Sequence, residues 1–176
     1  MSRAAIRPWT FKVIEFHLSG PDATGKLAQA LAKLCHRGDV IGLSGDLGAG
    51  KTTFARAFIH ARAVLAGVPG DEEVPSPTFT LAQIYEIGEV AVWHFDLYRL
   101  ERSEDAVELG IDEAFATAIS LIEWPERLDN LLPPDRLDLH LDITGAEGTP
   151  DETARTARIT GFGAWEGRLK DLDFHD

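Results

Sequence analysis

The chain has 176 residues, enough for one domain with a single core, and its 44% hydrophobic and 26% charged residues are typical of a globular protein. Its 29 acidic residues outnumber its 17 basic ones, which gives a formal net charge of −12. This charge argues against direct binding to nucleic acid or to an anionic membrane surface, because both depend on lysine and arginine.

The first part of the chain alternates extended and helical patterns. Residues 10–18 are strand-like, and a turn then leads into leucines at helical spacing through about Cys35. Residues 40–43 form a short apolar run typical of a buried parallel strand. A glycine-rich turn at residues 45–50 precedes a second helix, which is expected to end near Ala66. The stripe expected to face the core from this helix comprises Phe54, Phe58, Ala61 and Leu65.

The middle of the chain predicts a turn-rich segment, a hairpin and a helix. Residues 67–77 contain three prolines and two glycines, which excludes regular structure. Residues 78–87 and 89–97 are both strand-like and are joined at Gly88, so they are interpreted as a hairpin. A charged helix is predicted over residues 103–118.

The last third of the chain returns to strands. Residues 119–123 are a short apolar run that ends at a carboxylate, and residues 137–143 alternate in the manner of a half-buried strand. A loop at residues 144–152 precedes a final strand near residues 157–161. Residues 165–176 are interpreted as a short helix that frays.

These elements predict an α/β fold with a mixed, partly antiparallel sheet flanked by helices. We expect one domain over residues 1–176, with a core at about residues 10–161 and a C-terminal tail at residues 162–176. The single cysteine, Cys35, excludes an intrachain disulfide framework and a multi-cysteine zinc site, and is interpreted as a small apolar residue at a helix end. No signal peptide or bilayer-spanning apolar run is recognisable, so a cytoplasmic protein is expected.

One motif indicates phosphate binding. Residues 45–52, GDLGAGKT, satisfy the phosphate-loop pattern G-x-x-x-x-G-K-[ST], between an apolar strand and an amphipathic helix as the motif requires. The loop amides and the start of the following helix attract phosphate oxygens. Lys51 is expected to hold the β and γ phosphates, and Thr52 to offer its hydroxyl to Mg²⁺. The residues predicted to bind ATP are Asp46, Leu47, Gly48, Ala49, Gly50, Lys51, Thr52, Thr53 and Trp124.

Two strand ends supply candidate acids for the metal. Glu123 closes one apolar strand and Asp96 closes another, and ligands of such sheets gather at the carboxyl ends of strands. Either acid is a candidate Mg²⁺ ligand, with a structural carboxylate as the alternative for one of them. His94, a lone histidine in a strand, is interpreted as a core or surface residue.

The segment at residues 74–80 is predicted to be a switch. Its prolines limit the backbone, and Thr78, after Ser76 and Pro77, is placed to bind metal when a γ-phosphate is present. An inert loop that enters a strand is the alternative. The sequence lacks an Asn-Lys-x-Asp run for guanine and an Asp-x-x-Gly after the strand at Asp96, which favours ATP over GTP.

Five blocks in fixed order give the chain a specific resemblance. It resembles the TsaE (YjeE) ATPases of bacterial tRNA threonylcarbamoyladenosine synthesis over roughly residues 22–143, and the P-loop NTPase-like three-layer fold comes with that resemblance. The blocks are residues 45–54, 75–80, 94–100, 109–111 and 121–126.

The resemblance implies an ATPase that does not modify tRNA itself but acts on the synthase proteins TsaD and TsaB. It implies that Lys51 and Thr52 hold phosphate and Mg²⁺, that Thr78 belongs to the switch, and that Glu123 is the catalytically important acid with Asp96 in support. Trp124 would then lie near the nucleotide. Adenine contacts are implied around residues 18–24, and nothing carries over to residues 145–176.

Two other functions stay open on the sequence. One is a small-molecule kinase, for which Arg99, Arg102 and Arg127 are too scattered to form an evident lid. The other is a nucleotide-dependent binding switch without relevant hydrolysis. No arginine is identifiable as a finger, so weak basal activity, raised by the partners, is expected.

Overall fold

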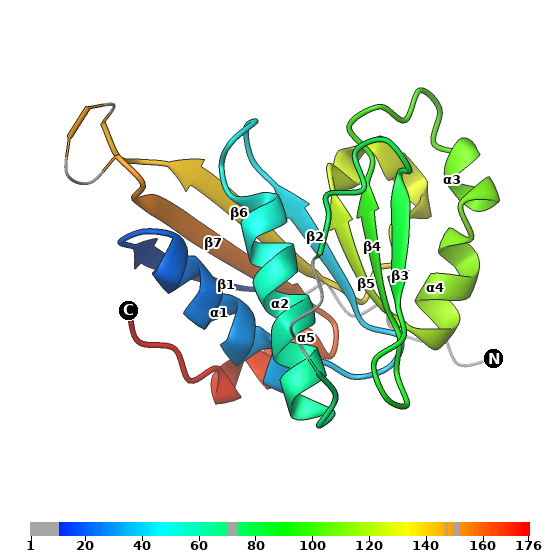
Figure 1. Ribbon diagram of the computed structural model, residues 1–176, viewed down its shortest axis with the longest axis horizontal. Helices are drawn as coiled ribbons and strands as arrows, with labels where there is room; N and C mark the ends of the chain where they lie inside the picture. Colours follow the sequence, from blue (N-terminus) through cyan, green and yellow to red (C-terminus); the bar gives the residue numbers. More distant parts are fainter. Residues whose placement is uncertain (1–10, 70–73, 147, 150–151) are drawn as a thin grey trace, which may run out of the picture.

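The computed structural model describes residues 11–69, 74–146, 148–149 and 152–176, which form a seven-stranded mixed sheet with helices on both faces (Figure 1). The predicted α/β fold with a partly antiparallel sheet is confirmed. The strands are β1 (Phe11–Leu18), β2 (Val40–Ser44), β3 (Ala82–Tyr85), β4 (Val92–Asp96), β5 (Ile119–Glu123), β6 (Leu137–Ile143) and β7 (Arg155–Phe162). The helices are α1 (Pro21–Leu34), α2 (Lys51–Leu65), α3 (Asp105–Glu108), α4 (Ile111–Thr117) and α5 (Trp165–Arg168), with 3-10 helices η1 (Pro125–Leu131) and η2 (Leu169–Asp171).

The sheet has a parallel centre and antiparallel margins. Its strand order is β1-β7-β6-β2-β5-β4-β3, in which β6, β2, β5 and β4 run parallel, while β1, β7 and β3 pair antiparallel with their neighbours. The parallel strands therefore bring their carboxyl ends to one edge of the sheet, which is where ligands bind in folds of this kind.

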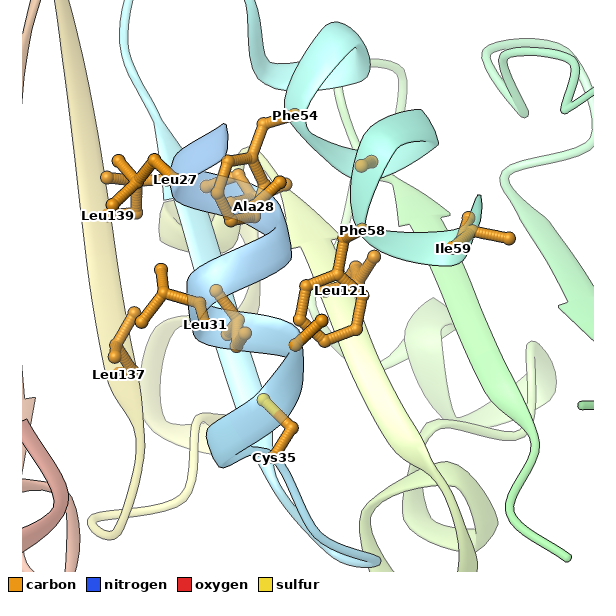
Figure 2. Packing of buried hydrophobic residues seen from close by; sticks show 14 of the residues in the cluster. Leu27, Ala28, Leu31, Cys35, Phe54, Phe58, Ile59, Leu121, Leu137 and Leu139 are labelled. Atoms are coloured by element: carbon orange, nitrogen blue, oxygen red, sulfur yellow. The ribbon is translucent and has the colours of Figure 1, made fainter. Parts of the chain in front are cut away.

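Helices α1 and α2 cover one face of the sheet. Leu27 and Leu31 of α1 and Phe54 and Phe58 of α2 are fully buried, and Figure 2 shows them above Leu121, Leu137 and Leu139 of the sheet. Cys35 is buried directly after α1, as expected, and burial raises the pKa of its thiol. These contacts fix the start of α2 over the carboxyl ends of the central strands.

The predicted core-facing stripe of α2 is wrong only at Leu65, because the half-buried Ala61 packs against the core. Phe54 and Phe58 are in the core, but Ala61 is half-buried and Leu65 is exposed. Ala55, Ile59 and Ala63, which the prediction did not include, are also buried. The last turn of α2 thus keeps Ala63 in the core and leaves Leu65 exposed.

Helices α3 and α4, with η1, cover the other face over β2, β5 and β4. Their apolar side chains pack on the strand residues whose side chains point away from α1 and α2, such as Val40, Phe95 and Ile122. The single helix predicted over residues 103–118 is wrong. It divides at Gly110, whose φ is +83° and whose Cβ position lies only 3.0 Å from the Trp93 ring, so a side chain here would be strained and crowded.

The predicted hairpin is confirmed with shorter strands. β3 and β4 pair antiparallel, but residues 78–81 form a turn in which the Leu81 amide donates to the Pro77 carbonyl oxygen at 2.6 Å. The segment predicted as a switch therefore leads into the edge strand β3 rather than forming its first residues.

The C-terminal segment packs on the core instead of fraying. Trp165 is fully buried, and Arg168 lies over its ring and pairs with Asp39 at 2.6 Å. At the end of the chain, Asp176 accepts hydrogen bonds from the amide and hydroxyl of Ser19. These contacts hold α5 and the end of the chain on the α1 side of the sheet (Figure 1).

Candidate active site

The phosphate loop connects the end of β2 to the start of α2. Residues 45–50 lie between Ser44 and Lys51, and α2 runs for 15 residues from there. The first amides of a helix have no partner within the helix and carry a partial positive charge, so this end of α2 favours an anion.

Gly45 presses the loop against β6. Its φ is +127°, and a Cβ at this position would lie 2.2 Å from the carbonyl oxygen of Leu141. No side chain fits such a gap, so the first glycine of the motif is required by close approach to a neighbouring strand as well as by its backbone angle.

Lys51 lies inside the loop that it follows. Its Nζ donates to the carbonyl oxygens of Gly45 at 2.7 Å and Asp46 at 2.8 Å, and lies 4.0 Å from the centroid of the Trp124 ring. Burial lowers the pKa of Lys51, while the carboxylates of Glu123 and Asp96 oppose that shift. The lysine is therefore a nearly buried cation in a place where phosphate oxygens can replace the carbonyls.

The two predicted acids are brought together by strand register. Asp96 at the end of β4 pairs with Glu123 at the end of β5, and both are buried. The Thr52 hydroxyl donates to Oε2 of Glu123 at 3.0 Å. Of the two acids, Glu123 is the one that contacts Thr52, the threonine of the phosphate-loop motif.

His94 is a site residue whose role the sequence did not indicate. It is fully buried, and its Nε2 lies 2.8 Å from Oε1 of Glu123, while its Nδ1 has no hydrogen-bond partner among the described residues. With a carboxylate as acceptor, Nε2 is the donor. Period-two alternation along β4 could have placed His94 on the same face as Asp96, but it does not reveal a contact with another strand.

Asp96 contacts the predicted switch. Its Oδ2 accepts from the Thr78 hydroxyl at 2.6 Å, and its Oδ1 accepts from the Tyr98 amide at 3.2 Å. The hydroxyls of Thr78 and Ser76 lie 2.7 Å apart, and Pro77 between them is buried. The segment therefore rests on the carboxylate that closes β4.

Most of these residues line an open pocket of about 220 Å³. Of the residues predicted to bind ATP, Asp46 and Ala49 do not line it: Lys51 contacts the Asp46 backbone, and the Ala49 side chain is buried in the core. Ser76 and Pro77 of the predicted switch do not line it either. Tyr98, whose ring lies 5.0 Å from that of Trp124, lines it without having been singled out. The lining residues are Leu47, Gly48, Gly50, Lys51, Thr52, Thr53, Thr78, Asp96, Tyr98, Glu123 and Trp124.

A smaller cavity of about 90 Å³ lies on the other side of the loop. It is bounded by the start of α1 through Pro21 and Thr24, and by Thr153 and Arg155 at the start of β7. It shares Gly48, Gly50 and Thr53 with the first pocket. The two hollows thus follow the phosphate loop on either side.

The oxygen donors suit a magnesium ion that is shared with a ligand. One hydroxyl and two carboxylates converge, from Thr52, Glu123 and Asp96. Among the residues that the structure describes, no group of three or more His, Cys, Asp or Glu side chains is arranged to hold a metal alone. Mg²⁺ characteristically binds through one or two carboxylates together with substrate phosphates, so the donor set fits it.

Comparisons with known proteins cover this site. A family model described as threonylcarbamoyl adenosine biosynthesis protein TsaE matches residues 18–153. The tRNA threonylcarbamoyladenosine biosynthesis protein TsaE of Rickettsia felis is 39% identical over 126 residues, 72% of this chain and 71% of that protein. The protein of the same name from Bacillus subtilis is 33% identical over 166 residues, 94% of this chain and 97% of that protein. A crystal structure of Bacillus subtilis YdiB matches with a TM-score of 0.73 and 28% identity, over 93% of this chain and 95% of that chain.

Proposed function

Since the chain belongs to the TsaE family of threonylcarbamoyl adenosine biosynthesis proteins, we propose that it is a Mg²⁺-dependent ATPase that acts on the TsaD and TsaB synthase proteins. In this proposal it does not bind the tRNA directly. The observation that carries the ATPase assignment is the contact between Thr52 and Glu123 at the start of α2, directly beside the phosphate loop.

Triphosphate binding is supported by the loop and by Lys51. The β and γ phosphates would take the place of the Gly45 and Asp46 carbonyl oxygens that now accept from Nζ. The exchange is favourable because a lysine bound to a phosphate has a full negative charge as its partner, whereas a carbonyl is only a dipole. The nucleoside would extend past Thr53 toward the smaller cavity, at the start of α1.

The carboxylates differ in what they would do. Mg²⁺, held by Thr52 and Glu123, would neutralise charge on the β and γ phosphates during in-line attack by water. His94 would keep Glu123 in its orientation through Oε1 while Oε2 faces Thr52. Asp96 would support the attacking water and, through Thr78, link the switch segment to the γ-phosphate.

The slow basal rate is proposed on charge, whereas the partners TsaD and TsaB are proposed on membership of the TsaE family. Lys51 is the cation among the described residues that line the larger pocket, so the charge spread over the γ-phosphate in the transition state is only partly balanced by the chain. Basal turnover would then be weak and would rise with TsaD and TsaB. A net charge of −12 disfavours direct tRNA binding, because RNA affinity depends on basic side chains.

Two substitutions test the ATPase assignment. K51A should abolish ATP binding, whereas E123Q should keep ATP binding and lose hydrolysis, as measured by calorimetry and phosphate release. The matched controls are K33A and E126Q, which remove exposed charges on α1 and three residues beyond Glu123. If E123Q hydrolyses ATP at the wild-type rate, the hydrolytic role of Glu123 is wrong. If the wild type binds ATP but releases no phosphate, a binding switch is the better account.

A further inference from the structure

Arg155 lies at the phosphate loop although it follows the part of the chain that matches the family model, residues 18–153. It is the first residue of β7, where it is paired with Leu18 of β1 on one side and Ile143 of β6 on the other. Its backbone is therefore fixed by strands on both sides, and its half-buried side chain starts from a rigid position.

The guanidinium group of Arg155 donates hydrogen bonds both to the phosphate loop and to the turn that precedes β7. Nε donates to the carbonyl oxygen of Ala49 and Nη2 to that of Gly48, each at 3.2 Å. Nη1 donates to the carbonyl oxygens of Ala154 at 2.8 Å and Glu152 at 3.1 Å. The planar fork of arginine spreads its five N–H donors over three nitrogens, so it reaches carbonyls on two sides, whereas the three donors of a lysine leave from one nitrogen.

One of these contacts holds Gly48, which packing leaves free, while the next residue, Ala49, is buried in the core. A Cβ at Gly48 would meet no atom within 4 Å, so no neighbouring side chain restrains this peptide from that direction. A phosphate-binding loop works by turning its N–H groups toward the anion, which leaves the carbonyls to point outward. Arg155 binds two successive carbonyls, of Gly48 and Ala49, from the outside.

The charge of Arg155 adds to the same effect. None of the ion pairs among the described residues includes Arg155, and its partners at the loop and in its own turn are neutral carbonyls. A positive charge without a carboxylate partner beside the loop raises the local potential for an anion.

We propose that Arg155 is a positioning residue that holds the phosphate loop in its anion-binding conformation, and that the ligand it prepares the loop for is the polyphosphate of a nucleotide. This rests on the ATP-binding function proposed above. Arg155 contacts the outside of the loop and not Glu123 or Asp96, so it acts on binding rather than on the hydrolytic step.

The test compares R155A, R155K and the control R158A, which removes an exposed arginine of the same strand that is paired with Glu15. For R155A we expect ATP and ADP affinities, measured by calorimetry, to fall by about tenfold or more, the loss of one charge-assisted hydrogen bond. The kcat at saturating ATP should stay within about twofold. R155K should recover part of the affinity, because it restores the charge without the fork.

A second measurement does not depend on nucleotide. Hydrogen exchange of the amides of residues 45–50 in the ligand-free protein should be faster in R155A than in the wild type and R158A. If R155A exchanges at the wild-type rate and binds ATP equally well, the proposal is overturned while the ATPase assignment stands. If kcat falls at an unchanged KM, Arg155 acts on hydrolysis and the positioning role is wrong. If the wild type does not bind ATP, the proposed function itself fails. Should R155A not fold, R155K in both measurements decides the same question.

Discussion

The close approach of Gly45 to β6 makes the loop sensitive to a single methyl group. The Cβ of an alanine at position 45 would lie 2.2 Å from the Leu141 carbonyl oxygen. Carbon and oxygen atoms in contact keep about 3.3 Å between them, so the loop or β6 has to move by about 1 Å. The positive φ of +127° adds strain of about 1–2 kcal/mol.

Two consequences are expected for G45A. Strain and overpacking together should lower the free energy of unfolding by about 2–5 kcal/mol, measured by urea denaturation. A displacement of about 1 Å at a catalytic loop should lower kcat/KM for ATP by about a hundredfold.

The control separates strain from displacement. Gly67 also has a positive φ, +69°, but a Cβ there meets nothing within 4 Å, and the residue lies beyond the far end of α2. G67A should therefore lose only about 1–2 kcal/mol of stability and keep the wild-type kcat/KM. Equal ATP kinetics in G45A and G67A would refute the view that contact with Leu141 shapes the loop.

Three further predictions concern His94 in the site and two buried residues elsewhere in the fold, Trp165 and Cys35. H94L should leave Oε1 of the buried Glu123 carboxylate without a donor, which should lower the free energy of unfolding by about 1.5–3 kcal/mol and weaken the Mg²⁺ dependence of ATP binding. H94Q, with an amide donor, should recover much of both, and equal behaviour of the two variants would contradict the hydrogen bond. W165A should lose about 3–5 kcal/mol of unfolding free energy. A loss below about 1 kcal/mol would mean that the C-terminal segment frays, as the sequence predicts. The Cys35 thiol, buried and with a raised pKa, should react with a disulfide reagent at pH 8 only at the rate of unfolding, and rapid labelling of native protein would count against its burial.

The order and type of the main elements were predictable because their signals are local. Alternation in residues 137–143 gave β6 with its observed bounds, and the apolar run of residues 119–123 gave β5. The glycine-rich motif located the loop between β2 and α2, and the family resemblance read from the motif blocks is confirmed by the matches to TsaE proteins.

The features that the sequence did not reveal depend on contacts between distant residues. The break at Gly110 depends on the Trp93 ring, and the buried tail depends on Trp165 reaching the core. The left-handed backbone of Trp124, with φ of 61°, also has no local sequence signal.

The candidate site likewise contains residues that local sequence signals predict and residues that depend on distant contacts. Lys51, Thr52, Asp96 and Glu123 could be named because each follows a loop motif or ends a strand, and register alone brings the two acids together. The contacts of His94 with Glu123, and of Arg155 with the loop across more than a hundred residues, follow from the strand order of the folded sheet.

Among the described residues, no helix has the length and apolar character needed to cross a membrane. The most direct test of the central proposal is the steady-state rate of phosphate release from MgATP by the purified chain, measured alone and with TsaD and TsaB. We predict slow release alone, a marked increase with both partners, and loss of that increase in E123Q. Rapid release by the chain alone, or a rate that the partners and E123Q leave unchanged, would contradict the account.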